Sequence, residues 1–227
     1  MSKKYPSFSR FRKDVKDLFF YFWYSDCAAV VHAAAAASQV EVDRLTVVFD
    51  SLAPLDAGAT GSHISKDRGV AVQFPSFPAS EAACGPAGRT LEYVNFTLNT
   101  LNIPTDESLW LQAALCPSAN GLPNCVKSDT PARITIETFD RRVKFQWFPA
   151  VPIVLEPATT YWFTVLSNGE TKDKFPIWLD GTKEFSTAND PRNEVLVAYT
   201  EKEGGPWDVL VRDDGNRLVP SFEVYAS

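Results

Sequence analysis

The sequence predicts an all-β fold: a two-sheet antiparallel β-sandwich, jelly-roll-like, preceded by an N-terminal helical or signal extension. Apolar and polar residues alternate along most segments after residue 45, as they do in strands with one buried and one solvated face. Turn residues separate these segments, and no long stretch after residue 45 has helical periodicity. We therefore expect residues 1–44 to form the extension and residues 45–227 to form one sandwich domain.

The segment 91–101 shows the alternation most clearly. Val94, Phe96 and Leu98 fall on one face, whereas Tyr93 and polar residues fall on the other, solvated face. Similar runs predict about eleven strands. The expected strands are 45–49, 70–74, 91–101, 109–115, 133–139, 142–148, 160–166, 175–179, 195–199, 207–211 and 221–225.

Glycine and asparagine pairs mark the expected reversals between these strands. The turn signals are Asn168-Gly169, Asp180-Gly181, Gly204-Gly205-Pro206 and the run 213–216. Residues 75–88 are rich in proline and alanine, so we expect a long surface loop there.

Charge and composition narrow the classes of partner. The net charge is −6 and no basic stripe follows residue 45, which argues against a nucleic-acid partner because phosphates require clustered lysine and arginine. The apolar fraction of 45% is sufficient for a packed core.

The cysteines predict a disulfide. The chain has four, without a C-x-x-C pair that would indicate zinc: Cys27, Cys84, Cys116 and Cys125. The last two flank a short loop in which Asn120-Gly121 predicts a turn, so their ends should meet. A bridge across this loop should stabilise the fold by about 2–3 kcal/mol in an oxidising compartment. Two free thiols on neighbouring strands are the alternative, and Cys84 has no obvious partner.

The N-terminal segment has the order of a signal peptide. Basic residues in 1–17 precede an aromatic run and then an alanine-rich run, with cleavage expected after Ala35 or Ala37. Asp26 interrupts the apolar part. The segment is therefore a cleaved signal or signal anchor, an amphipathic helix on a membrane or partner, or a helix packed on the domain.

Export predicts an extracellular or cell-surface location, with membrane contact only through residues 1–44 if they are retained. Asn95-Phe96-Thr97 is an N-x-[ST] triplet, so Asn95 is a candidate glycosylation site in an exported protein.

Three segments carry a family resemblance: the runs 47–52 and 69–74 and, most specifically, 155–165. The last reads L-E-P-A-T-T-Y-W-F-T-V, close to an L-x-P-G-T-T-Y-W signature in which Ala158 takes the usual glycine position. In this order of features the chain resembles the choice-of-anchor β-sandwich domains of exported surface proteins, over roughly residues 45–226. The resemblance implies an exported sandwich and no particular chemistry.

The residues offer no enzyme active site. Only His32 and His63 are present, without a nucleophile-elbow motif, and no glycine-rich phosphate loop occurs. We expect no cofactor, although calcium is possible: Asp213, Asp214 and Asn216 share one loop, and such oxygen donors suit this ion. An ordinary turn without metal is the alternative.

Tryptophans are the most suggestive candidates for ligand binding, because an exposed indole can stack on a sugar ring. Trp147 and Trp162 fall at core positions of strands. Trp178 and Trp207 lie beside turn signals, and we expect these two to face a ligand.

Three functions remain open. The first is a non-catalytic exported or surface module that binds carbohydrate or protein. The second is a structural subunit of a larger assembly, with residues 1–44 as an uncleaved arm. The third is a glycoside hydrolase with a carboxylate pair. The carboxylates near aromatic residues are Glu137, Asp140, Asp173, Asp180 and Glu184, and no spacing singles out a pair.

Overall fold

The structure is a computed structural model. It describes residues 45–54, 60–81, 88–104, 108–125, 133–170, 175–186, 195–209 and 216–227, which all belong to the unit Leu45–Ser227. The predicted extension 1–44 lies outside the described residues, together with the signal-peptide, arm and membrane-contact hypotheses that depend on it. Cys27, Cys84, Asp213 and Asp214 also lie outside them.

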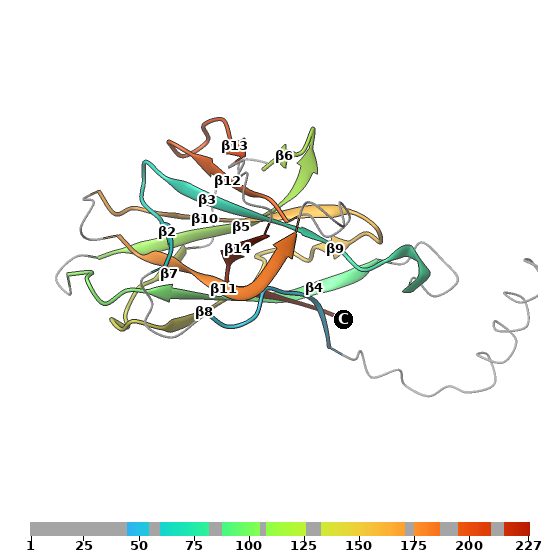
Figure 1. Cartoon of the computed structure of the whole chain (residues 1–227), viewed down its shortest axis with the longest axis horizontal. Coiled ribbons are helices and arrows are strands. Elements are labelled where there is room, and N and C mark those ends of the chain that lie inside the picture. Colours follow the sequence, from blue (N-terminus) through green and yellow to red (C-terminus); the bar gives the residue numbers. More distant parts are fainter. Residues whose placement is uncertain are drawn as a thin grey trace, which may run out of the picture. The chain divides into compact units, whose positions relative to one another are not determined.

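The predicted fold class is confirmed: two antiparallel sheets form a sandwich (Figure 1). The first sheet has the order β1 (Thr46–Asp50), β15 (Phe222–Ala226), β4 (Arg89–Asn99), β11 (Ile177–Ser186) and β14 (Asn216–Pro220). In the same sheet, β2 (Gly61–His63) pairs with β11, and β8 (Val143–Trp147) and β9 (Val154–Leu155) pair with β4.

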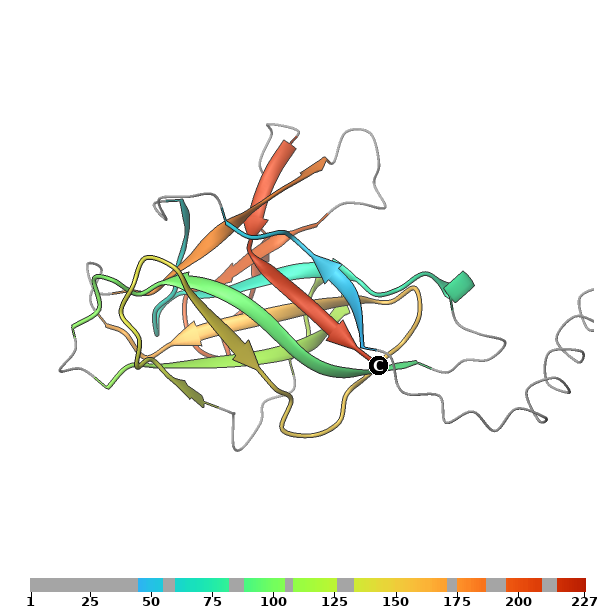
Figure 2. The same cartoon turned by 90° about the horizontal axis from the view of Figure 1, so that it is seen from below.

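The second sheet lies against the first. Its order is β13 (Asp208–Val209), β12 (Val197–Thr200), β3 (Gly69–Pro75), β10 (Thr160–Ser167), β5 (Trp110–Ala119) and β6 (Leu122–Pro123), and β7 (Arg133–Thr135) pairs with β5. A short 3-10 helix, η1 (Ala79–Glu81), follows β3. Figure 2 shows the two sheets from below.

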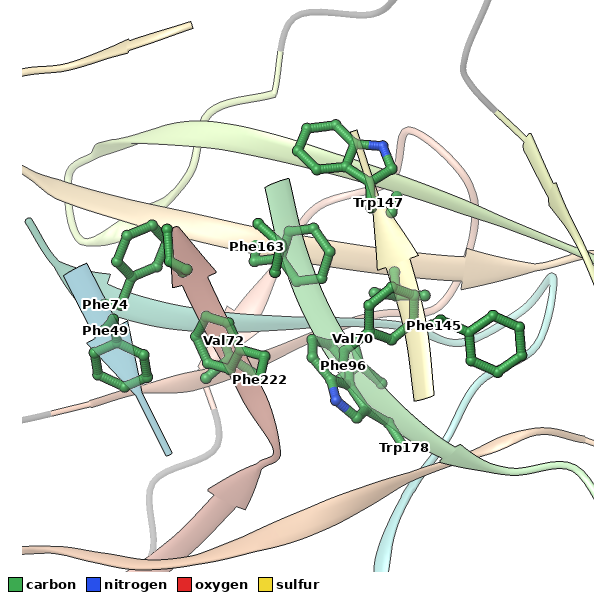
Figure 3. Packing of buried hydrophobic residues seen from close by; sticks show 14 of the residues in the cluster. Phe49, Val70, Val72, Phe74, Phe96, Phe145, Trp147, Phe163, Trp178 and Phe222 are labelled. Atoms are coloured by element: carbon green, nitrogen blue, oxygen red, sulfur yellow. The ribbon is translucent and has the colours of Figure 1, made fainter. Parts of the chain in front are cut away.

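Aromatic rings from both sheets fill the space between them (Figure 3). Phe163 of the second sheet is fully buried, and its ring lies 5.5 Å from Phe96 and 6.0 Å from Phe222 of the first sheet. Each such ring pair contributes about 0.5–1.5 kcal/mol beyond the apolar area that it buries. The alternation predicted for 91–101 is therefore correct, because Val94, Phe96 and Leu98 face this core.

The predicted disulfide is confirmed between Cys116 and Cys125. Strands β5 and β6 form a hairpin whose two-residue turn is Asn120-Gly121, with φ angles of 53° and 75°. Positive φ at both positions is the requirement of a type I′ turn, which asparagine followed by glycine meets best. The turn brings together Cys116 and Cys125, which are nine residues apart in the sequence, as the sequence predicts.

The prediction of a reversal at Asp180-Gly181 is wrong, because both residues lie inside β11. Gly181 is needed for close approach: a Cβ there would lie 2.2 Å from the carbonyl oxygen of Ser51. The glycine thus marks a backbone contact with the segment after β1 and does not mark a turn.

The predicted strand 133–139 pairs only over Arg133–Thr135. Four further strands, β2, β6, β9 and β14, were not predicted. They are short or polar, so they lack a run of alternating residues long enough to recognise.

The segment 155–165 forms the entry to β10. Ala158 has a φ of 50°, a left-handed conformation that favours glycine. Tyr161, Trp162 and Phe163 then follow, with exposed fractions of 7% or less on both faces of the strand.

Candidate functional site

An aromatic row crosses the outer face of the first sheet. The strand register places Val47 of β1 opposite Tyr225 of β15, and Tyr225 opposite Tyr93 of β4. The two tyrosine rings are nearly parallel, at 26°, with centroids 4.5 Å apart. Phe148, directly after β8, lies 5.8 Å from the Tyr93 ring. We call Val47, Tyr225, Tyr93 and Phe148 the aromatic row.

The aromatic row faces away from the core because of the strand alternation. Val94 and Val224, the neighbours of Tyr93 and Tyr225 in sequence, are fully buried in the core. Val47 and Phe148 are 53% and 57% exposed, and the two tyrosines are half-buried. The row is therefore open apolar surface that carries two hydroxyl groups, a combination suited to recognition.

Glu223 is the centre of a polar cluster beside the aromatic row. Its Oε2 atom accepts hydrogen bonds from Lys144 Nζ at 2.9 Å, Asn95 Nδ2 at 3.1 Å and the Tyr225 hydroxyl at 3.1 Å. The residues come from three neighbouring strands, because Glu223 pairs with Asn95 and Lys144 pairs with Thr97. Tyr225 belongs to both the row and the cluster, so the two are continuous.

The cluster keeps Glu223 ionised. Partial burial by itself raises the pKa of this carboxyl, but the hydrogen bonds from Lys144 and Asn95, the charge of Lys144 and the hydrogen bond from Tyr225 outweigh it. The net effect lowers the pKa of Glu223. Burial and the hydrogen bond to Glu223 raise the pKa of Tyr225, so its hydroxyl stays protonated and donates.

A pocket of about 210 Å³ opens next to the Glu223 cluster. Its polar lining includes Asn95 and Thr97 of β4, Glu223 of β15, and Ser221, which lies between β14 and β15. The segment Leu52–Pro54 forms one wall. Arg142, directly before β8, and Lys144 of β8 complete the polar lining.

Hydrogen bonds of the Asp50 and Ser51 side chains hold the start of this wall in place. Ser51 Oγ accepts from the Phe222 amide at 2.7 Å and lies 3.1 Å from the Pro220 carbonyl oxygen, to which it can donate. The Leu52 amide donates to Asp50 Oδ1 at 2.6 Å, and Leu52 adopts a positive φ of 63°. Such a conformation is unusual for leucine and persists only where its surroundings hold it.

The far end of the wall is bonded to β11 and to Arg142. Both the amide and the hydroxyl of Thr182 donate to the Ala53 carbonyl, at 3.3 and 3.0 Å. Arg142 Nη2 donates to the Pro54 carbonyl at 2.9 Å. The wall is therefore a fixed part of the fold.

Trp178, predicted to face a ligand, does not, and this prediction is wrong. The side chain is fully buried between the sheets, with its ring 5.8 Å from that of Phe163, and Nε1 donates to the Ser221 carbonyl at 2.9 Å (Figure 3). The error follows from the misread turn at Asp180-Gly181, since Trp178 lies inside a strand and not beside a loop.

Trp207 lies on the other sheet and is half-buried. It packs against a small cluster on the outer face of the second sheet, formed by Ala71, Cys116, Trp162 and Ala198. The two predicted tryptophans are therefore not brought together. Trp147, in the core between the sheets, and Trp162, in this outer cluster, are 5% and 0% exposed, which confirms that both are buried.

Asn95 is poorly placed for a glycan. The residue is 8% exposed in the middle of β4, and Nδ2, the atom that a glycan would occupy, donates to Glu223. The structure thus contradicts the prediction of Asn95 as a glycosylation site, because the buried side chain leaves no room for an attached glycan. Its role here is to line the pocket.

The remaining site predictions fall at the edge of the described residues. Asp213 and Asp214 lie outside them, and Asn216 is the first residue of β14, so calcium binding stays a prediction.

None of the helices in the described ranges has the length and apolar character to cross a membrane.

The Glu223 cluster is suited to binding more than to acid catalysis. The general acid of a glycosidase needs a raised pKa, whereas the pKa of Glu223 is lowered. Of the carboxylates predicted from sequence, Asp173 lies outside the described residues. The other four do not line the pocket: Glu137, Asp140, Asp180 and Glu184.

Comparison with known proteins gave no match to a family model or to a curated protein. The resemblance to choice-of-anchor domains stays a prediction, and the functional conclusion depends on the geometry of the outer face.

The sequence carried one signal of this site. Tyr93 is a large aromatic residue on the solvated face of a predicted strand, where small or charged residues are usual. Its pairing with Tyr225 depends on the register between β4 and β15, which are far apart in the chain. No local pattern encodes that register.

Proposed function

We propose that residues 45–227 are a non-catalytic module that binds carbohydrate on the outer face of the first sheet. The aromatic row carries this proposal: an open apolar row of three rings leads directly into a cluster of hydrogen-bonding side chains. Sugar rings present apolar C–H patches and polar hydroxyls side by side, and this arrangement matches both.

We further propose that the module is exported or displayed at the cell surface. The disulfide Cys116–Cys125 supports this location, because disulfides persist in oxidising compartments and are rare in reducing ones. An oligosaccharide ligand agrees with the same location.

A glycan array tests the proposal. Wild-type protein is compared with Tyr93→Ala and Tyr225→Ala, and with Tyr199→Ala as the matched control. Tyr199 is also a half-buried tyrosine but lies on β12 of the second sheet, below Arg68 and bonded to Ser62.

We expect wild-type protein and Tyr199→Ala to bind the same glycans. Tyr93→Ala and Tyr225→Ala should lose at least about fivefold in affinity, since removing a central aromatic contact costs more than about 1 kcal/mol. The proposal is wrong if wild-type protein binds no glycan, or if all three variants bind equally.

A protein partner is the second candidate. Val151 and Val154 are 68% and 55% exposed, and β9, which carries Val154, pairs with β4 beside the aromatic row. Exposed aliphatic side chains next to aromatic ones are typical of protein interfaces. Val151→Ser with Val154→Ser should weaken binding to a protein partner and leave glycan binding unchanged.

A further inference from the structure

We infer that the side chains of Lys144 and Asn95 become joined by an amide bond, which the folded protein forms by itself with Glu223 as the proton carrier. The bond links β8 covalently to β4, its neighbour in the first sheet. This inference goes beyond the proposed function and does not depend on it.

The strand register brings the three side chains together. Glu223 of β15 lies opposite Asn95 on one side of β4, and Lys144 of β8 lies opposite Thr97 on the other side. Asn95 and Thr97 are two residues apart and share a face, so Lys144 and Asn95 are diagonal neighbours within reach of a long side chain. Because Lys144 Nζ bonds to Glu223 across β4, the lysine side chain passes over β4 close to Asn95.

One oxygen atom contacts both reacting groups. Glu223 Oε2 accepts from Lys144 Nζ at 2.9 Å and from Asn95 Nδ2 at 3.1 Å. The Tyr225 hydroxyl bonds to the same oxygen and holds the carboxylate in place. Glu223 can therefore take a proton from the attacking nitrogen and give one to the departing nitrogen, as a general base and then a general acid.

The reaction balances without a further reactant. Glu223 accepts a proton from the Lys144 ammonium, and the neutral Nζ attacks Cγ of Asn95. Nζ then loses a second proton, Glu223 passes a proton to Nδ2, and the Cγ–Nδ2 bond breaks. The products are a secondary amide between Nζ and Cγ, one ammonium ion and the ionised Glu223.

Proximity favours this step over its rate in free solution. Well-oriented groups within one molecule react as if each were present at about 10⁵ M or more. Asn95 is 8% exposed, so its carboxamide is shielded from water, the competing nucleophile.

The charge state makes the step slow. Glu223 must begin ionised in order to accept the proton, which agrees with its lowered pKa, but a carboxylate of lowered pKa is a weak base. The Lys144 side chain is 58% exposed, and water also favours its ammonium form. We therefore expect the bond to form gradually, after the strands have paired.

The cross-link fixes a strand that carries part of the aromatic row. Within the described ranges β8 pairs only with β4, and Phe148 follows β8 directly. A covalent bond to β4 keeps β8 and Phe148 in place when the chain is pulled or attacked by proteases.

The test measures the intact mass of the folded full chain before and after incubation at neutral pH, followed by peptide mapping. Lys144→Arg keeps the positive charge but cannot form the amide, and Glu223→Gln removes the proton carrier. Lys66→Arg is the matched control, because Lys66 also bonds to a glutamate, Glu170, at 2.7 Å but lies outside this cluster.

We expect wild-type protein and Lys66→Arg to lose one ammonia per molecule and to yield one branched peptide that joins Asn95 to Lys144. Lys144→Arg should yield neither, and Glu223→Gln should form the bond at least about a hundredfold more slowly. The cross-linked protein should melt about 5–15 °C higher than the fresh protein, because the bond closes a long loop in the unfolded chain.

The inference is overturned if incubated wild-type protein keeps the mass of the unmodified chain, or if Lys144→Arg loses ammonia as fast as wild type. Equal rates in wild type and Glu223→Gln would refute the role of Glu223. The proposed function is tested separately, since glycan binding on the array can fail while the cross-link forms, and the reverse.

Discussion

The two outer faces of the sandwich differ in how far their aromatic residues are buried. On the second sheet, Trp162 points outward from β10 yet is fully buried, because Trp207 and Val209 pack over its cluster and Nε1 is bonded to Ser118. On the first sheet, Tyr93 and Tyr225 also point outward and remain partly exposed. A covered outward aromatic stabilises the fold, whereas an open one is available to a ligand.

The sharpest test of this difference compares Trp162→Ala with Tyr93→Ala. We expect Trp162→Ala to lower the free energy of unfolding by about 3–5 kcal/mol, as for other fully buried large-to-small changes. Tyr93→Ala should lower it by less, about 1–2 kcal/mol, because the ring is only partly buried. Urea unfolding measures both, and equal losses would show that the aromatic row is structural.

Removal of the disulfide should give the second largest loss of stability, because the bridge lies on the covered outer face of the second sheet. Cys116 belongs to the same cluster as Trp162. Cys116→Ala with Cys125→Ala should lower the free energy of unfolding by about 2–3 kcal/mol on the chain-entropy model for a loop of this length. Glycan binding by the folded variant should be unchanged. A loss of glycan binding at a temperature where the variant is folded would contradict the separation of the two faces.

Gly181 tests the wall of the open face. A Cβ at this position would meet the Ser51 and Leu52 carbonyl oxygens at 2.2 and 2.8 Å, so Gly181→Ala must displace the segment that forms the wall. We expect a loss of about 1–3 kcal/mol in the free energy of unfolding, together with weaker glycan binding.

Gly169→Ala is the matched control for this substitution. A Cβ there would first meet the Phe175 ring at 3.3 Å, a side chain that can move. Equal effects of the two substitutions on glycan affinity would argue against a role for the wall.

The smallest effect concerns pH and Glu223. Because the pKa of Glu223 is lowered in the folded state, its contribution is present above the unfolded pKa of about 4.3 and is lost as pH falls through the folded value. Glu223→Gln removes this contribution. The difference in melting temperature between wild-type protein and Glu223→Gln should therefore shrink between pH 5.5 and pH 3. A difference that is constant over this range would contradict the lowered pKa.

The sequence predicted what depends on local pattern. Alternation along 91–101 located β4 and its two faces, and Asn120-Gly121 located the hairpin that brings Cys116 to Cys125. These features depend on neighbouring residues, so a reading of the sequence can recover them.

The candidate site depends on distant pairing and was not predicted as a whole. Tyr93 was placed on a solvated face, but its contact with Tyr225 requires the register of two strands far apart in the chain. Trp178 was misplaced because Asp180-Gly181 has the composition of a turn, whereas its glycine serves a close backbone approach to Ser51. An Asp-Gly pair can form a turn or can allow a close backbone approach within a strand, and the local sequence does not distinguish the two.

The most direct measurement of the central claim is amide chemical-shift mapping by NMR as the best glycan from the array is added. We predict that the shifts concentrate on β1, β15, β4 and β8, around Tyr93, Tyr225 and Glu223. Shifts that concentrate instead on the outer face of the second sheet, around Trp207 and Trp162, would contradict the assignment of the open face as the binding surface.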